Sequence, residues 1–319
     1  MKRRSLMKAA ALMAAMGIAA PAVAQDAEKK IIGVSIPSAT HGFMGGLNWH
    51  AQDTIKRLGV AYPNLEFVLS TAGDPAKQVN DIEDMMATRN IDALVVLPFE
   101  SEPLTAPVKA VKDAGKFVTV VDRGLSQEGI EDLYVAGDNT AFGRVAGEYF
   151  RDTLPAGAKV VVLRGIPTTL DNERVDAFRA ALEGSEVQIL DMQHGNWNRD
   201  DAFAVMQDYL AKYPQIDAVW AADDDMAIGV LEAISAANRQ DEMWVIGGAG
   251  MKEIVKRIMD GDKQLPVNVT YPPALISSAI EMTALNFVSN APMTGRFIIS
   301  SQLITPENAE QFYYPDSPF

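Results

Sequence analysis

The chain has 319 residues, of which 48% are hydrophobic, and its 28 Lys and Arg residues against 42 Asp and Glu residues give a formal net charge of −14. A chain of this length and apolar content buries a substantial core and is expected to form two lobes, while its acidic balance argues against a nucleic-acid partner, which needs clustered basic residues. Because cysteine is absent, disulfides, thiolate nucleophiles, cysteine-ligated zinc and lipid attachment through an N-terminal cysteine are excluded.

Residues 1–24 are predicted to be a cleaved export signal peptide. Basic residues precede the apolar run "AALMAAMGIAA", and Ala22-Val23-Ala24 offers the small-x-small pattern that signal peptidase cuts. The alternative is a membrane anchor, but the run is shorter than the roughly 20 residues that span a bilayer. "KRRSLMK" resembles the twin-arginine export motif, although general secretory signals also begin with basic residues, so both routes remain open.

Cleavage would remove four basic residues and no acidic one. Lys and Arg would fall from 28 to 24 against 42 acidic residues, and the net charge from −14 to −18. The mature protein is therefore expected to be acidic, soluble and free in the periplasm.

Short β-branched runs alternate with helix-patterned segments along the rest of the chain. The predicted strands are residues 29–36, 64–70, 92–98, 116–122, 132–137, 158–165, 186–192, 217–222, 242–248 and 266–271. The predicted helical segments include residues 43–58, 81–90, 146–154 and the segment after Asp225. Continuous apolar strands separated by helices indicate parallel sheets covered on both faces. So many strands exceed one compact sheet, and the predicted fold is α/β with two doubly wound parallel-sheet lobes.

Polar and aromatic residues follow several predicted strands. In such sheets ligands bind at the carboxyl ends of the strands. Carboxylates, guanidinium groups and aromatic rings together suit a ligand with many hydroxyls and an apolar C–H face. The candidate residues are His41, Phe43, Asp122, Arg123, Asn172, Arg174, Trp197 and Asp223.

Structural alternatives exist for most of these candidates. Asp122 and Arg123 are compatible with an intramolecular ion pair, Arg174 with an exposed charge early in a helix, and Phe43 with a core position. Trp197 lies in a polar loop, which favours a binding surface. No metal site or cofactor is expected, because the histidines lack ligand-like spacing, and no catalytic motif indicates an enzyme.

The order of several motifs resembles a known family over essentially the whole mature chain. These include "IIGVSIPSATHGFMGG", "VTVVDRG", "VAGDNTAFGRVAGEYF", "VVVLRGIPTTLDNERVDAFRAAL" and "AVWAADDDMAIGVLEAI". They resemble the ribose-binding-protein-like components of bacterial ABC sugar importers, which are type I periplasmic binding proteins. Related transcriptional repressors share the D-N-x-x-x-G and D-x-x-A-x-G-x-x-x-A patterns but carry an N-terminal helix-turn-helix, which the export signal replaces here.

The resemblance implies two lobes joined by a three-strand hinge, which close on a sugar and are then recognised by an inner-membrane ABC permease. It implies a lobe of residues 30–137 plus 272–296 and a second lobe of residues 138–271 plus 297–319. Phe43 and Trp197 would sandwich the sugar ring. Asp122 and Arg123 would bind hydroxyls from the first lobe, and Arg174 and Asp223 from the second. No chemistry on the ligand is implied, and the protein is expected to be a monomer.

The chain departs from the ribose-binding members at several of these positions. Met44 replaces a second stacking phenylalanine and Ala249 replaces an aspartate, while Tyr271 and His41 stand where those members have glutamine and asparagine. These differences favour another pentose, a hexose or a polyol, with His41 and Tyr271 as discriminating contacts. Two other functions stay open: a periplasmic sensing subunit for a chemoreceptor or sensor kinase, and an exported enzyme.

Two further segments carry structural expectations. In "AADDD", Asp224 and Asp225 are expected to cap their own helix and occupy its first turn, while Asp223 ends the strand at the cleft, where no helix needs it. As an acceptor, Asp223 would partly replace the carboxylate missing at Ala249. The aromatic tail "FYYPDSPF" is expected merely to pack on one lobe.

Overall fold

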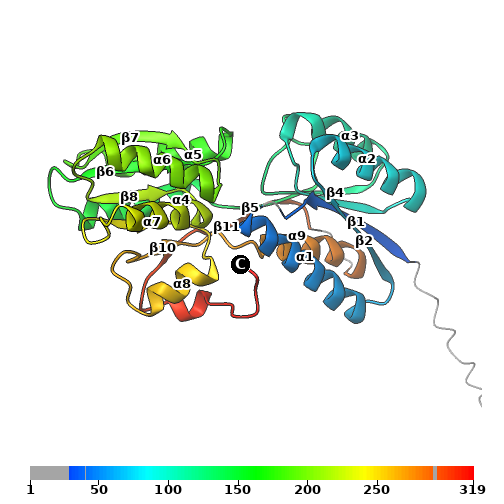
Figure 1. Ribbon diagram of the computed structural model, residues 1–319. Coiled ribbons are helices and arrows are strands. Elements are labelled where there is room, and N and C mark those ends of the chain that lie inside the picture. The colour runs from blue at the N-terminus through cyan, green and yellow to red at the C-terminus, as the bar shows by residue number, and fades with distance from the viewer. Residues whose placement is uncertain (1–28, 40, 290–292) are drawn as a thin grey trace, which may run out of the picture.

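The computed structural model describes residues 29–39, 41–289 and 293–319 (Figure 1). The predicted signal peptide, residues 1–24, lies outside these residues. Within the described ranges, none of the helices has both the length and the apolar character needed to cross a bilayer.

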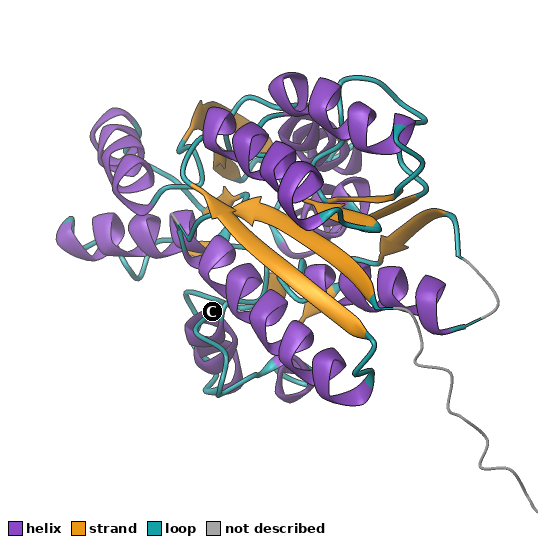
Figure 2. Ribbon diagram, turned by 90° about the vertical axis from the view of Figure 1, so that its right-hand side faces the viewer, coloured by secondary structure: helices purple, strands orange, loops and turns teal. Residues whose placement is uncertain are grey.

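The first lobe is built on a six-stranded parallel sheet in the order β11-β5-β4-β3-β1-β2. Its strands are β1 (Lys30–Pro37), β2 (Leu65–Ala72), β3 (Ala93–Val96), β4 (Phe117–Val121), β5 (Leu133–Gly137) and β11 (Gly295–Ile299). Its helices are α1 (Gly42–Ala61), α2 (Pro75–Asp84) with the π-helical turn η1 (Met85–Arg89), α3 (Ser101–Asp113) and α9 (Leu275–Val288). Helices α2 and α3 cover one face of the sheet and α1 and α9 the other (Figures 1 and 2).

The second lobe has a four-stranded parallel sheet in the order β7-β6-β8-β9. Its strands are β6 (Lys159–Arg164), β7 (Gln188–His194), β8 (Ala218–Ala221) and β9 (Trp244–Ile246). Its helices are α4 (Asn139–Thr153), α5 (Thr169–Ala181), α6 (Arg199–Lys212), α7 (Asp224–Ala236) and α8 (Lys252–Met259). Helix α4 packs against α5, and α6 against α7. The predicted class, two doubly wound parallel-sheet α/β lobes, is confirmed.

The chain passes between the lobes three times. It leaves the first sheet at the end of β5 to enter α4, and it returns between β10 (Asn268–Val269) and α9. It crosses again from β11 to β12 (Leu303–Ile304), which pairs antiparallel with β10. The pairing of β11 with β5 runs to Ile299, three residues past the lobe boundary expected at 296/297.

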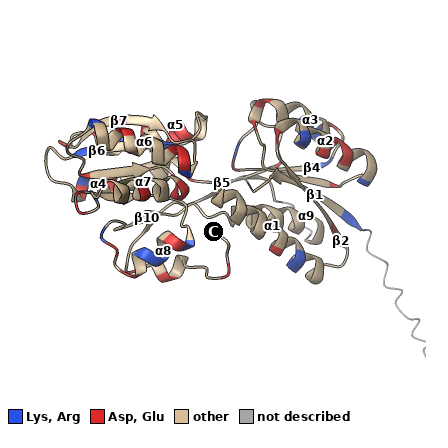
Figure 3. Ribbon diagram, viewed as in Figure 1, with Lys and Arg blue, Asp and Glu red and all other residues tan. Residues whose placement is uncertain are grey.

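Apolar strands and helix faces hold each lobe together. In β6, Val160, Val161 and Val162 are fully buried, as expected for a strand covered on both faces. Charged residues are dispersed over the helices of both lobes (Figure 3). Ion pairs such as Lys109–Asp113 are solvent-exposed, so they contribute little beside the buried apolar area.

Candidate ligand-binding site between the lobes

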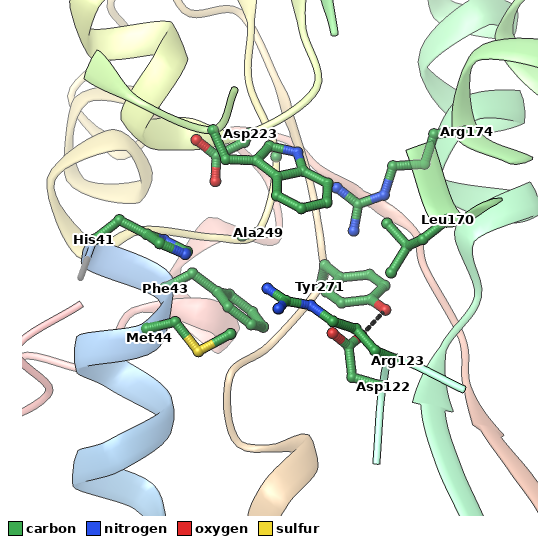
Figure 4. A pocket seen from close by; sticks show the side chains of 12 residues that line it. His41, Phe43, Met44, Asp122, Arg123, Leu170, Arg174, Asp223, Ala249 and Tyr271 are labelled. Carbon is green, nitrogen blue, oxygen red and sulfur yellow. Dashed lines mark hydrogen bonds between the residues drawn. The ribbon is translucent and has the colours of Figure 1, made fainter. Parts of the chain in front are cut away.

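A cavity lies where the two lobes meet. Strand ends of both sheets supply part of its walls, because the carboxyl ends of parallel strands collect at one edge of each sheet. The starts of α1 and α5 supply further lining residues. In Figure 4, Arg174 and Asp223 approach the cavity from one side, and Phe43 and Asp122 from the other. The lining residues are His41, Phe43, Met44, Asp122, Arg123, Leu170, Arg174, Trp197, Asp223, Gly248, Ala249 and Tyr271.

All but one of the sequence-based candidates line this cavity. The exception is Asn172, which is exposed on α5 and accepts a hydrogen bond of 2.7 Å from the Arg164 guanidinium. Leu170 at the start of α5 is a lining residue that was not predicted, because an apolar residue there carries no polar signal in the sequence.

Tyr271 and Asp122 join the hinge to the first lobe. The Tyr271 hydroxyl donates a 2.5 Å hydrogen bond to Asp122 Oδ1 (Figure 4). Burial raises the pKa of Tyr271 well above its usual value, so the phenol stays protonated and remains a donor. Asp122 has a left-handed backbone with φ of +58°, a strained conformation for a non-glycine residue.

Two hydrogen bonds and two aromatic rings hold the Arg174 guanidinium in place. Its Nε donates to Asn139 Oδ1 at 2.9 Å, and its Nη1 donates to the Ala222 carbonyl at 2.9 Å. The guanidinium carbon lies 4.1 Å from the centre of the Phe142 ring and 4.5 Å from that of Tyr271. The side chain is buried, so the alternative of an exposed helix charge is wrong. Preorganised in this way, the guanidinium loses little entropy on meeting a ligand.

Asn139 is a supporting residue that the sequence analysis did not single out. It accepts from Arg174, and its Nδ2 lies 3.4 Å from the Tyr271 hydroxyl as a donor. Asn139 directly follows the first crossover between the lobes. It belongs to the D-N-x-x-x-G pattern, which in the sequence indicated the fold but no role for this side chain. Its side chain therefore ties the Arg174 guanidinium to the hinge tyrosine.

Arg123 does not form the ion pair with Asp122 that the structural alternative required. Among the described residues, its Nη1 donates to the Phe99 carbonyl at 2.8 Å, whereas Asp122 accepts from Tyr271. Both side chains thus keep polar atoms next to the cavity.

Asp223 is the N-cap of α7, which corrects the expectation that no helix needs it. Its backbone is extended, with φ of −170° and ψ of 154°, and its Oδ1 accepts from the Met226 N–H at 3.0 Å. Because it also lines the cavity, one carboxylate serves the helix and the site together. Burial, followed by the nearby Asp225, raises the pKa of Asp223 well above its usual value.

Asp224 and Asp225 occupy the first turn of α7 as expected, but neither accepts from the helix's own free N–H groups in the way proposed. The Oδ2 atom of Asp224 accepts from the N–H groups of Gly250 and Met251, at 3.0 and 2.7 Å, fixing the loop that carries Ala249. Asp225 Oδ2 accepts from the Gly42 N–H of the other lobe at 2.8 Å. The acidic run therefore organises three different segments around the cavity.

Two lining residues have buried nitrogens without a hydrogen-bond partner in the described part of the chain. These are His41 Nδ1 and Trp197 Nε1. Burial lowers the pKa of His41, which favours the neutral imidazole, able both to donate and to accept. An unpaired buried polar atom is costly, so a ligand that pairs with these nitrogens gains affinity.

The cavity continues into a wider cleft toward solvent. The two share Asp122, Arg123, Leu170 and Trp197, and the cleft runs between the start of α3 and the start of α5. This opening offers a path by which a small molecule reaches the cavity. Across residues 29–39, 41–289 and 293–319, no group of three or more His, Cys, Asp or Glu side chains is arranged to hold a metal ion.

Comparison with known proteins gives a family for this architecture. A family model described as periplasmic binding protein domain matches residues 32–288. The chain is 30% identical over 259 residues to a ribose import binding protein of Bacillus subtilis, covering 81% of each chain.

Two solved structures are also similar to this chain. A Caulobacter myo-inositol binding protein, bound to myo-inositol, shares 27% identity with a TM-score of 0.78, covering 88% of this chain and 95% of its own. The fructose-binding periplasmic domain of a hybrid two-component system shares 25% identity with a TM-score of 0.77, covering 88% and 92%.

Proposed function

Because this chain belongs to the periplasmic binding protein domain family, we propose that it captures a neutral sugar or polyol between its lobes in the periplasm and delivers it to an ABC permease of the inner membrane. One observation carries the proposal. Two carboxylates, two guanidinium groups and aromatic rings converge on a single cavity from both lobes. This set matches adjacent hydroxyls and the C–H face of a sugar or cyclitol ring.

The lining favours a neutral ligand. Asp122 and Asp223 supply two carboxyl groups, while Arg123 and Arg174 supply two guanidinium groups. Each also keeps hydrogen-bonding capacity for a ligand, since a carboxylate has two oxygens and a guanidinium has five donors. Burial disfavours the ionised form of Asp223, so the preference rests on desolvation rather than on a balance of charges. A ligand with a net charge would lose its hydration in this buried site, at a large cost in free energy.

The lining also favours a ligand other than ribose. The Tyr271 hydroxyl already donates to Asp122 Oδ1, so this oxygen is less available to a ligand. Ala249 supplies a methyl group where the ribose-binding members have a carboxylate. Fewer acceptors and more apolar surface suit a ligand with a larger apolar face, such as a hexose or a cyclitol.

A site shared by two lobes is suited to trapping a ligand without changing it chemically. A ligand that touches both lobes only when they are together stabilises that arrangement, and the permease can then distinguish the loaded protein. No covalent step is needed, so the protein is proposed to be a non-enzyme.

A sensing role is the second candidate. It is favoured by the likeness to the fructose-binding domain of a hybrid two-component system. The ligand site would be the same, and only the partner that reads the closed lobes would differ. Pull-down of a permease rather than a sensor from inner membranes, in the presence of ligand, separates the two.

A thermal-shift screen against pentoses, hexoses and polyols tests the proposal. A ligand at 100 times its dissociation constant should stabilise the protein by about 2.7 kcal/mol. Trp197→Ala should remove most of the shift while the ligand-free protein still folds, because a stacking face is lost. If no carbohydrate shifts the melting temperature, or if a bound sugar is converted to product, the proposal is wrong.

A further inference from the structure

The segment that ends at Phe319 contacts both lobes, not one as expected from the sequence. After the 3-10 turn η2 (Ala309–Phe312), it passes beside α8, where Lys252 Nζ donates to the Pro315 carbonyl at 3.2 Å and to the Ser317 carbonyl at 2.5 Å. It then reaches the start of α1, so that the C label of Figure 1 lies between α8 and α1. The segment is thus held by the second lobe and inserted into the first.

Phe319 is the residue that this segment inserts. It is only 4% exposed, and its ring meets Phe43 edge to face, with centroids 6.0 Å apart and an interplanar angle of 89°. Helix α1 makes room for it at Gly46, where a Cβ atom would lie 2.6 Å from the Cβ of Phe319. A larger residue at Gly46 would therefore displace Phe319 or the helix.

Phe43 lines the cavity, but Phe319 does not. Around Phe43 the structure places His41 at 6.5 Å and Tyr271 at 6.0 Å between ring centroids, and both of these residues line the cavity. Among the described residues, Phe319 is the third ring in contact with Phe43, and it packs behind Phe43 with the hinge residue Pro273 nearby. The position of the Phe43 ring in the cavity therefore depends on a residue outside it.

We infer that Phe319 is a positioning residue, which holds the Phe43 ring at the angle at which it packs on a ligand. This inference rests on the proposed function, in which Phe43 stacks on a sugar or polyol. The segment is also anchored on α8 of the other lobe, through the bonds that Lys252 donates to the Pro315 and Ser317 carbonyls. Loss of the ring would leave space behind Phe43 and let it turn away from the ligand.

Phe319→Ala is the variant that tests the inference, with Phe319→Leu as the conservative rescue. Tyr314→Ala is the matched control, because Tyr314 is an aromatic residue of the same segment but is 58% exposed. Titration calorimetry with myo-inositol, D-ribose and D-allose in turn should show about three- to tenfold weaker binding for Phe319→Ala. Phe319→Leu should restore most of the affinity, and Tyr314→Ala should bind as the parent does.

A second readout needs no ligand. The chain has three histidines, and the ring of His41 lies stacked with that of Phe43 at an interplanar angle of 15°. Its imidazole NMR signals should therefore shift in Phe319→Ala, while those of His194 on β7 stay in place. In a Phe43→Ala background, Phe319→Ala should no longer move the His41 signals, since the two residues act through one contact.

The outcomes separate this inference from the proposed function. If the His41 signals do not move and the affinity stays within about twofold of the parent, the positioning role is refuted. If the His41 signals move as described but the parent protein binds no carbohydrate, the proposed function fails and the support of Phe43 by Phe319 stands.

Discussion

Ala249 shows backbone strain at a single residue of the site. Its φ is +113°, in a region that favours glycine, and its N–H is held by the Val269 carbonyl at 2.8 Å. Asp224 fixes the two following N–H groups, so the loop cannot relax. Strain of this kind costs on the order of 1–3 kcal/mol and persists where the surroundings over-determine the conformation.

We predict that Ala249→Gly raises the free energy of unfolding by about 1 kcal/mol, because relief of strain outweighs the added entropy of glycine in the unfolded chain. Urea denaturation measures the change. Ala136→Gly is the control: Ala136 lies in β5 without a positive φ, and it should lose stability. A loss of stability in Ala249→Gly would show that the backbone at Ala249 is not strained.

Site residues that directly follow a buried strand can be predicted from the sequence. For residues on a helix, the side chain that faces the cavity depends on the residue at which the helix begins, which is harder to predict. Asp122 directly follows the buried strand β4, so its place at the sheet edge is predictable. Asn172 and Arg174 are two positions apart on α5, about 200° around the helix axis, so only one can face the cavity. Which one does depends on the N-cap at Thr168, which the sequence analysis did not fix.

At the scale of elements, the packing of α4 against α5 places Arg174. A Cβ atom on Gly143 of α4 would lie 1.8 Å from the Arg174 carbonyl oxygen of α5. Only glycine lets the two backbones approach this closely. The helix that carries Arg174 is therefore positioned by a residue with no side chain.

Gly143→Ala should lower the free energy of unfolding by about 3 kcal/mol and weaken ligand binding, because α5 must move outward with its arginine. Gly59→Ala is the matched control in α1, where an added Cβ has no atom within 4 Å. It should gain about 0.5–1 kcal/mol from helix propensity. Chemical denaturation and calorimetry of both variants check the pair, and equal responses would contradict the packing argument.

The strands β1 to β10 overlap the ten runs predicted from the sequence. Central strands such as β3 and β8 are buried along their whole length, which leaves a continuous apolar signal. The edge strands β2 and β7 are only partly buried, and their apolar residues are interrupted by polar ones. β11 and β12 were missed. β11 is an edge strand whose residues Gly295 to Phe297 are exposed, so it lacks the pattern of a buried strand. Its pairing with β5 depends on tertiary contacts rather than on local sequence.

At the scale of the whole molecule, Asp225 connects the lobes. His41, which precedes α1, makes no capping bond through its side chain, and the Gly42 N–H instead donates to Asp225 Oδ2 of the second lobe. The carboxylate thus lies at the positive end of the α1 dipole. Arg199 Nη2 lies 3.5 Å from the other Asp225 oxygen and partly balances its charge. The acidic cluster at this junction was evident from the sequence. The hydrogen bond between Asp225 and Gly42 was not, because the two residues are 183 positions apart in the chain.

This bond can exist only while the lobes are in contact, so it stabilises the closed arrangement without stabilising either lobe. A charge-assisted hydrogen bond contributes about 1.5 kcal/mol, so Asp225→Ala should weaken ligand binding by roughly tenfold. Small-angle scattering of the ligand-free protein should show a larger radius of gyration. This second measurement matters because Asp225 also lies near His41, where loss of its charge acts on the ligand directly.

Two further variants separate the bond from the charge. Asp225→Asn keeps an acceptor oxygen for Gly42 but no charge, and it should fall between the parent and Asp225→Ala. Arg199→Ala keeps the bond and should stay close to the parent, since the Arg199 side chain is 42% exposed and its ion pair is screened. If Asp225→Ala binds as tightly as the parent and leaves the radius of gyration unchanged, the lobes close by other contacts, and Asp225 serves only its own lobe.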